Sequence, residues 1–254
     1  MKVRIALLLI ALLLLFGMAR ANGSSRLGPP PVPEDNPQTP EKIELGKQLF
    51  FDRRLSGDGT MSCSTCHDPK QGFSDGLPTS LSYPTTKNWR NSPTLFNVAF
   101  QKRLFHDGRA ASLEEQALFP MISAFEMNQN LDFLEEELRA VPEYRQAFAA
   151  VFGDPDITRE RVAQALAAFQ RTLVSSEAPL DKFVGGDREA LSPQAQKGYE
   201  VFSGKGGCLS CHGGPMLSDN GFHALMVEEI RESEDDPRLA ATRRFVAKVS
   251  GYQD

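Results

Sequence analysis

All four cysteines of this 254-residue chain lie in two copies of one short motif. Each copy has two Cys separated by two residues and followed directly by a His: Cys63, Cys66 and His67, and then Cys208, Cys211 and His212. Two thiols at this spacing can add to both vinyl groups of one haem, and the adjacent His can bind the iron. The motifs therefore predict two covalently bound haem c groups and leave no cysteine for a disulfide.

Two other uses of the motifs remain open at this point. The Cys and His side chains could form a pair of zinc knuckles, since zinc accepts both ligand types. Each Cys pair could also be a redox dithiol of the C-x-x-C type. Export of the chain favours haem over zinc, because covalent haem attachment takes place outside the cytoplasm. The His that follows each pair has no role in a plain dithiol, which also favours haem.

The N-terminus has the layout of a secretory signal peptide. Lys2 and Arg4 precede an apolar run over residues 5–16, and residues 19–21 (ARA) form a small-x-small cleavage site. The apolar run is short for a membrane span, although an uncleaved N-terminal anchor is the alternative. We expect residues 1–21 to be removed and the protein to reach the periplasm. The formal net charge of −5 shows no basic excess, so no nucleic-acid partner is expected.

Helical patterns dominate the rest of the sequence. Residues 22–40 contain six prolines and predict an extended arm, whereas helix signals follow from residue 41 onwards. These signals are helix-start residues and apolar repeats at Ser112, Asn130, Pro142, Thr158 and Ser192. No convincing alternating strand pattern is present. The fold class predicted is mainly α, with two cytochrome c-like haem domains and long loops.

An internal repeat supports two related domains. Residues 46–50 (GKQLF), the first motif and residues 73–76 (FSDG) correspond to residues 197–202 (KGYEVF), the second motif and residues 217–219 (LSD). At about 150 residues per domain, the length allows one or two domains. We expect a signal peptide at 1–21, an arm at 22–40, an N-terminal haem domain at 41–185 and a C-terminal haem domain at 186–254.

Several segments in a fixed order resemble the bacterial di-haem cytochrome c peroxidase and MauG family. The resemblance runs from about Glu41 to His223. Its segments are residues 45–52 (LGKQLFFD), 90–97 (RNSPTLFN), 107–110 (DGRA), 116–117 (QA), 126–127 (EM) and 141–144 (VPEY), together with the two haem motifs. The resemblance implies that the N-terminal haem reacts with peroxide and that the C-terminal haem passes electrons to it.

The resemblance also implies roles for individual residues. His67 and His212 would bind the two haem irons. Glu126 would be the acid–base residue beside the first haem, with Gln116 near it. Taken alone, without the resemblance, Glu126 is better explained as a surface acid at a helix end. Asn91 would help to bind a calcium ion, whereas an Asn before Ser-Pro is otherwise a turn residue.

The sequence departs from the family pattern in three places. No His lies between His67 and His106, where many relatives carry a displaceable iron ligand, and Tyr83 lies near that position. His106 replaces the Trp that commonly precedes the Asp-Gly-Arg segment, and it is compatible with a relay or with a structural role. The chain ends at Asp254, whereas the family usually continues further, so we expect either that the C-terminal haem domain is truncated or that the second haem has lost its family ligand.

Three functions follow as expectations. The first is a peroxidase that reduces hydrogen peroxide to water, with electrons from a small cytochrome c or cupredoxin. The second is a MauG-like oxidase that acts on a partner protein, and the missing displaceable His favours it slightly. The third is a non-catalytic di-haem electron carrier. The resemblance is also compatible with a homodimer.

Overall fold

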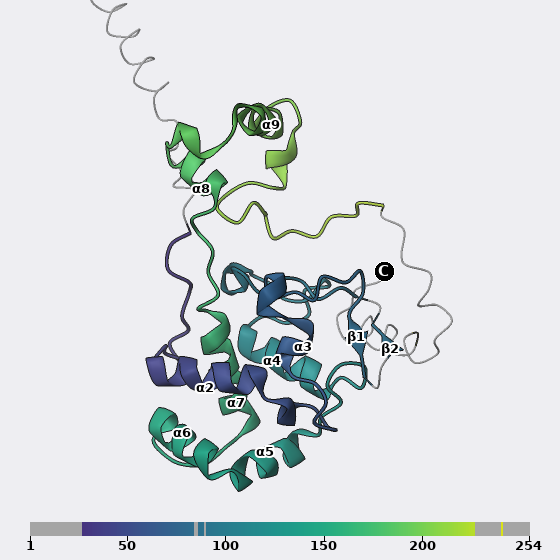
Figure 1. Ribbon diagram of the computed structural model, residues 1–254, viewed down its shortest axis with the longest axis vertical. Coiled ribbons are helices and arrows are strands. Elements are labelled where there is room, and N and C mark those ends of the chain that lie inside the picture. Colours follow the sequence, from purple (N-terminus) through teal and green to yellow (C-terminus); the bar gives the residue numbers. More distant parts are fainter. Residues whose placement is uncertain (1–26, 84–85, 89, 227–239, 241–254) are drawn as a thin grey trace, which may run out of the picture. The chain divides into compact units, whose positions relative to one another are not determined.

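The computed structural model describes residues 27–83, 86–88, 90–226 and 240 of the chain. The expected signal peptide and Trp89 lie outside these residues. The structure is mainly helical (Figure 1). Its α-helices are α2 (Pro40–Phe51), α3 (Cys63–Cys66), α4 (Leu113–Ile122), α5 (Leu131–Ala140), α6 (Pro142–Phe152), α7 (Arg159–Gln170), α8 (Pro179–Val184) and α9 (Pro193–Ser203).

Short elements connect these helices. Single-turn 3₁₀ helices are η1 (Arg53–Leu55), η2 (Pro69–Gln71), η3 (Val98–Phe100), η4 (Arg188–Ala190) and η5 (Cys208–Ser210). Strands β1 (Leu81–Ser82) and β2 (Thr86–Lys87) form one small antiparallel pair, in which Leu81 is opposite Lys87. The prediction of a mainly helical chain is confirmed.

The helix starts follow the capping residues of the sequence. Ser112 and Thr158 accept hydrogen bonds from the backbone N–H groups of Glu115 and Arg161, at the starts of α4 and α7. Asn130 caps α5 in the same way. Pro142 and Pro193 occupy the first helical positions of α6 and α9, where a missing N–H costs nothing.

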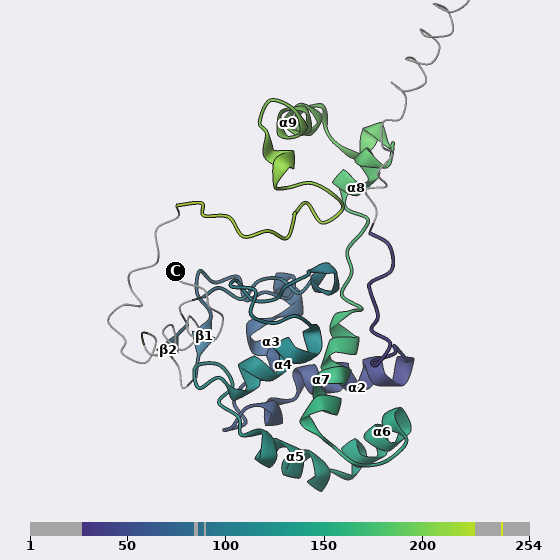
Figure 2. The same cartoon turned by 180° about the vertical axis from the view of Figure 1, so that it is seen from behind.

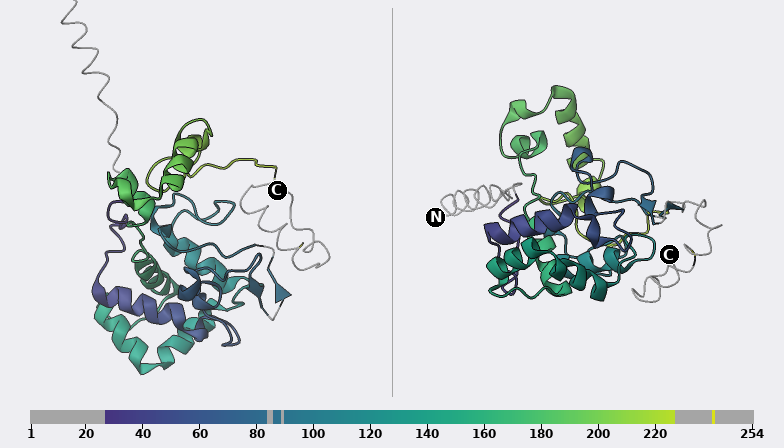
Figure 3. Two further views of the ribbon diagram at one scale, coloured as in Figure 1. Left: turned by 45° about the horizontal axis from the view of Figure 1, so that its top comes forward. Right: turned by 60° about the horizontal axis from the view of Figure 1, so that its bottom comes forward.

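The chain divides into two compact units. One comprises Pro29–Ser175 with Asn220–Asp254, and the other includes Ser176–Asp219. The first unit is built on the packing of α2 against α7, which Figures 1 and 2 show from opposite sides and Figure 3 from two further directions. The expected boundary at residues 185–186 stays a prediction.

Gly46 allows the close approach of α2 to α7. A Cβ atom at Gly46 would lie 1.8 Å from the backbone oxygen of Ala165, so only glycine fits there. Around this contact, α2 contributes Leu45, Leu49 and Phe50, which are all buried. The periodic apolar residues of the α7 segment, Val162, Leu166, Phe169 and Leu173, are also buried.

The proline-rich arm is fixed to this unit by a buried polar network. Asn36 is 1% exposed, and its amide donates to the Glu114 carboxylate (2.7 Å) and to the backbone oxygen of Gln164 (3.0 Å). The ammonium group of Lys42 donates to Asn36 (2.9 Å), and the guanidinium of Arg171 donates to Glu114 (2.6 Å). The arm is therefore attached to the helices at this point rather than acting as a free linker.

The second unit has little core of its own. Among the described residues of 176–219, only Phe183 is buried. Phe183 packs edge-on against Tyr199, and Tyr199 stacks on Phe202. Val201, Leu209 and Leu217 are 38–44% exposed.

Across the described part of the chain, no helix is both long and apolar enough to span a membrane.

Candidate functional site

The first haem motif occupies the short helix α3 and the residue after it. The backbone N–H of Ser62 donates to the Thr65 hydroxyl (3.0 Å), which fixes the start of this helix. Cys63 packs against the main hydrophobic core, and Cys66 and His67 are half-buried. Local hydrogen bonding therefore holds the two thiols on one helical turn, with the His directly after them.

The two motif histidines share one hydrogen-bond pattern. His67 Nδ1 lies 2.9 Å from the backbone oxygen of Phe73, and His212 Nδ1 lies 3.1 Å from that of Leu217. A carbonyl only accepts, so Nδ1 acts as the donor in both contacts, and Nε2 is the ring atom that a neutral imidazole would offer to a metal. Metal-bound histidines usually have this arrangement, because the donor bond fixes the tautomer and the ring orientation. Both motifs thus fit an iron ligand at Nε2.

The thiol pKa values of the first motif argue against a redox dithiol. Burial raises the pKa of the Cys63 thiol to about 12 and that of Cys66 to about 11. A redox dithiol instead requires a thiol with a lowered pKa. Burial also lowers the pKa of His67, which favours the neutral ring that binds a metal.

Glu126 lies in the turn that follows α4 and is half-buried. Burial raises its pKa, and two weaker effects oppose that rise: a hydrogen bond with the Ser123 side chain and the positive charge of Arg109. The charge of Glu126 in turn contributes to the raised pKa of the Cys66 thiol. The Glu126 carboxyl is therefore within electrostatic reach of the first haem motif.

Backbone hydrogen bonds define the turn that carries Glu126. The backbone N–H of Glu126 donates to the backbone oxygen of Ser123 (3.0 Å), and the backbone N–H of Asn128 donates to the same backbone oxygen (2.9 Å). The N–H of Tyr83 donates to the Phe125 oxygen (3.0 Å), so the β1–β2 segment lies against this turn. The Cys66 thiol in turn approaches the Leu81 oxygen of β1 (3.9 Å).

Arg109 is a site residue that our sequence reasoning did not single out. Its guanidinium makes two hydrogen bonds to Asp107 (2.9 and 3.0 Å), whose side chain is only 3% exposed. The guanidinium carbon lies 3.4 Å from the Phe105 ring centre and 5.7 Å from that of Phe119. The Asp107-Gly108-Arg109 segment was the available signal, since its Arg has a buried acid two residues away.

Other predicted site residues lie at distinct places on the same unit. Gln116 is half-buried on α4, whereas Leu113, Ala117 and Met121 of the same helix are buried. Asn91 is exposed, and its amide donates to the Leu77 oxygen (2.5 Å). His106 is exposed, and Tyr83 is half-buried. Their predicted roles stay predictions.

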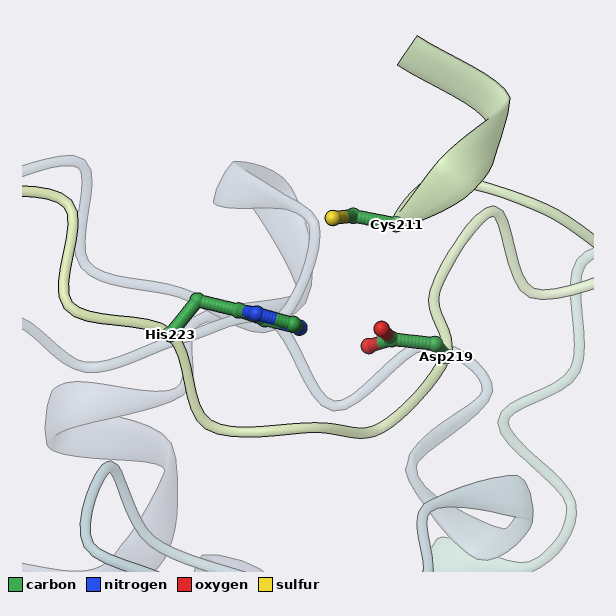
Figure 4. Close-up of side chains that lie close together, drawn as sticks. All are labelled: Cys211, Asp219 and His223. Carbon is green, nitrogen blue, oxygen red and sulfur yellow. The ribbon is translucent and has the colours of Figure 1, made fainter. Parts of the chain in front are cut away.

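The second motif spans η5 and the residues after it. Cys208 and Cys211 are half-buried and His212 is exposed. The backbone N–H of Asp219 donates to the Cys211 oxygen (2.8 Å), which closes the loop that holds His212. Figure 4 shows the side chains of Cys211 and Asp219 within this unit. The exposed apolar residues Val201, Leu209 and Leu217 are suited to a haem face.

The fold and the two motifs define a helical c-type haem protein with two attachment sites. Residues 40–189 match the family described as di-haem cytochrome c peroxidase, and the chain belongs to this family. Cytochrome-c peroxidase IdrP1 of Pseudomonas sp. (strain SCT) is 42% identical over 99% of this chain and 68% of its own length. Methylamine utilization protein MauG of Methylophilus methylotrophus is 47% identical over 77% of this chain and 59% of its own length.

Solved structures agree with this assignment. A MauG-like protein associated with microbial copper homeostasis superposes with a TM-score of 0.71 at 34% identity. That match covers 81% of this chain and 61% of the other. The present chain thus spans about 60–70% of the length of these relatives.

Proposed function

We propose that this chain acts as a di-haem c-type peroxidase, which reduces hydrogen peroxide to water with electrons from a small redox protein. Glu126 carries the proposal, because burial raises the pKa of its carboxyl group and its charge reaches Cys66 of the first motif. Peroxide cleavage needs a group that takes a proton from one oxygen and returns it to the other. A carboxyl with a raised pKa is suited to both steps.

The chain's own residues divide the work between the two sites. When bound, the haem groups supply one-electron redox chemistry and an iron to which peroxide can bind. Glu126 moves the proton, and Ser123 holds the carboxylate through its side-chain hydrogen bond. Gln116 can donate hydrogen bonds to peroxide or water but cannot take up charge. His67 and His212 would hold the irons through Nε2, while Nδ1 stays hydrogen-bonded to the backbone.

The donor and the compartment follow from the same proposal. The exposed second motif suits electron entry from a small cytochrome c or cupredoxin, since His212 is accessible to solvent. The signal peptide predicted at residues 1–21 is consistent with function in the periplasm, where haem is attached to such motifs. Two further parts of the proposal are a calcium ion at Asn91 and a homodimer.

A MauG-like oxidase that acts on a partner protein is the second candidate. No His lies between His67 and His106, so no displaceable imidazole closes the first haem from that segment. The 47% identity to a methylamine utilization protein MauG supports the same candidate. A third candidate, a non-catalytic electron carrier, lacks a use for the raised pKa of Glu126.

The resting spectrum of the oxidised protein and its change on adding peroxide test these candidates. We expect one high-spin and one low-spin haem, with the high-spin haem reacting rapidly. Steady oxidation of a reduced cytochrome c by peroxide then identifies a peroxidase, whereas reaction with peroxide but no donor turnover identifies the oxidase candidate. Two low-spin haems that ignore peroxide overturn both and leave the electron carrier. A fully low-spin first haem alone contradicts an open site and points to closure by Tyr83.

A further inference from the structure

A tight loop after His67 contains two groups that act on the His67 ring: the backbone oxygen of Phe73 and the carboxylate of Asp75. The backbone N–H of Asp68 donates to the Ser74 oxygen (3.0 Å), and the N–H of Phe73 donates to the Asp68 oxygen (2.8 Å). Phe73 has a positive φ of 58°, which turns its carbonyl to the point where it accepts the His67 Nδ1–H. Asp75 follows two residues later in the same loop.

One carboxylate oxygen of Asp75 accepts a hydrogen bond, and the other has no hydrogen-bond partner within the described residues. Asp75 Oδ1 accepts a hydrogen bond from the backbone N–H of Leu77 (3.0 Å), which fixes the carboxylate in the turn. Asp75 Oδ2 is buried and has no hydrogen-bond partner within the described residues. An unpaired carboxylate oxygen is costly to bury, so its presence calls for an explanation.

Asp75 is within electrostatic reach of two residues of the first haem motif, Cys66 and His67. It contributes to raising the pKa of the Cys66 thiol, and it opposes the lowering of the pKa of His67 by burial. Two residues of the motif therefore experience the same negative charge. Charges interact strongly where water is excluded, and the Asp75 Oδ2 atom is such a case.

We propose that Asp75 is a positioning residue of the first haem site, whose fixed negative charge stabilises the oxidised iron and lowers the reduction potential of this haem. The ferric form carries one more positive charge than the ferrous form, so a nearby carboxylate favours it. The proposal rests on haem binding at Cys63, Cys66 and His67, and it does not depend on peroxide turnover.

The internal repeat supplies a matched comparison. Asp219 holds the position in the second motif that Asp75 holds in the first, but Asp219 is exposed, as is His212. Figure 4 shows the Asp219 side chain close to that of Cys211. Solvent screens the charge of Asp219, so its effect on haem potential is expected to be small. The two acids thus give the two haems different electrostatic surroundings.

Potentiometric titration of the haem-loaded, full-length protein tests the proposal. Asp75→Asn keeps the Oδ1 that accepts from Leu77 but removes the charge, and we expect it to favour reduction of the first haem about tenfold. Tenfold in this one-electron equilibrium corresponds to about 59 mV. Asp219→Asn is the matched control and should leave the first haem unchanged. Electron paramagnetic resonance signals of the two haems identify which haem is reduced in each step, or wave, of the titration.

Further variants make each outcome decisive. Asp75→Glu keeps the charge, so the reduction potential of its first haem should be close to that of the parent. This variant serves as the test if Asp75→Asn does not retain haem. The proposal fails if Asp75→Asn keeps both haems and neither wave moves, or if Asp219→Asn moves the first wave equally. It also fails if the shift needs added calcium, because Asp75 then serves a cation. A parent that titrates normally but ignores peroxide overturns only the proposed peroxidase function.

Discussion

At the scale of single residues, Glu126 shows how its surroundings set the chemistry of a carboxyl group. Burial favours the neutral acid, whereas Ser123 and Arg109 favour the carboxylate. Arg109 can do so because Asp107 and the Phe105 ring fix its guanidinium. The balance leaves a pKa above that of an ordinary Glu, which suits a group that takes up and returns a proton.

Glu126→Gln should slow the reaction with peroxide by about 10²- to 10⁴-fold while keeping both haems, because the amide cannot move a proton. The rate of the parent should rise with pH through the raised pKa of Glu126, since the carboxylate takes the first proton. This rise of the rate with pH, the acid limb of the pH–rate profile, should be absent in Glu126→Gln. Stopped-flow absorbance in the Soret band, recorded across the pH range, measures both effects.

Gln116→Ala is the matched comparison, and it should cost about tenfold because only a neutral hydrogen bond is lost. An unchanged rate in Glu126→Gln would remove Glu126 from the proton transfer. An acid limb that persists in Glu126→Gln would assign the titration to another group.

Glu114 is a second acid whose role differs from the one its position predicts. The sequence places it beside Glu115 in the first turn of α4, where acids favour the helix dipole. In the structure only Glu115 completes the cap, by accepting from the backbone N–H of Ala111 (2.8 Å). Glu114 instead pairs with Arg171 and Asn36. No local pattern indicates a partner 57 residues away.

Glu114→Gln should lower the free energy of unfolding by about 3 kcal/mol, because it leaves the Arg171 guanidinium buried without its counter-charge. The loss lies at the lower end of the usual range for a broken buried pair, because the Glu114 side chain is 21% exposed, against 4% for Arg171. The pKa of Glu114 is lowered in the folded protein, with the Asn36 and Arg171 contacts outweighing burial. Urea unfolding of the haem-loaded protein measures the loss.

Because the pKa of Glu114 is lowered in the folded protein, the stability that this residue contributes depends on pH in a defined direction. A lowered folded pKa adds stability above the unfolded value of about 4.3, and the gain disappears as the pH falls through the folded pKa. The parent and the variant should therefore converge in stability at low pH. Glu115→Gln should stay within about 0.5 kcal/mol of the parent, since Gln also completes the cap. Equal losses in both variants would contradict a specific pair.

At the scale of helices, the two repeated glycines have different surroundings. Gly46 on α2 lies against the backbone of α7, and a Cβ there would meet the Ala165 oxygen. Gly198 on α9 has no atom within 4 Å of a Cβ position. The repeat makes the two look alike, so only the packing distinguishes a required glycine from a replaceable one.

Gly46→Ala should destabilise the protein by about 1–3 kcal/mol, because the added methyl group forces two packed helices apart. Gly198→Ala should be neutral or stabilise by up to about 1 kcal/mol, since alanine favours a helix interior. Thermal unfolding followed by far-UV circular dichroism compares the two. A Gly46→Ala protein that melts with the parent would show that α2 and α7 do not meet as described.

Helix starts were the part of the fold most accessible from sequence. Ser112, Asn130, Pro142, Thr158 and Ser192 each mark one, because caps are decided by neighbouring residues. The haem motifs were accessible for the same reason. The Asn36 and Lys42 contacts were not, since they depend on how distant segments pack. Arg109 and Asp75 also needed the structure, because burial gives them their importance.

At the scale of the whole chain, the two motifs predict two haems on one polypeptide. Intact-mass measurement of protein from a host with haem-attachment machinery should show two added haem groups and the loss of residues 1–21. Replacing both Cys208 and Cys211 with Ala should remove one haem and leave the reaction with peroxide at the other. A mass equal to the bare polypeptide, or to a zinc form, would contradict the haem assignment.

The unit that includes Ser176–Asp219 has a consequence for how much of the protein accumulates in a cell. With Phe183 as the only buried side chain among its described residues, the polypeptide alone has too little apolar contact to resist unfolding. A haem bonded to Cys208 and Cys211 would supply the missing apolar contact. Chains that miss this step would be open to proteases. We therefore expect haem supply, as well as gene expression, to control the abundance of the protein.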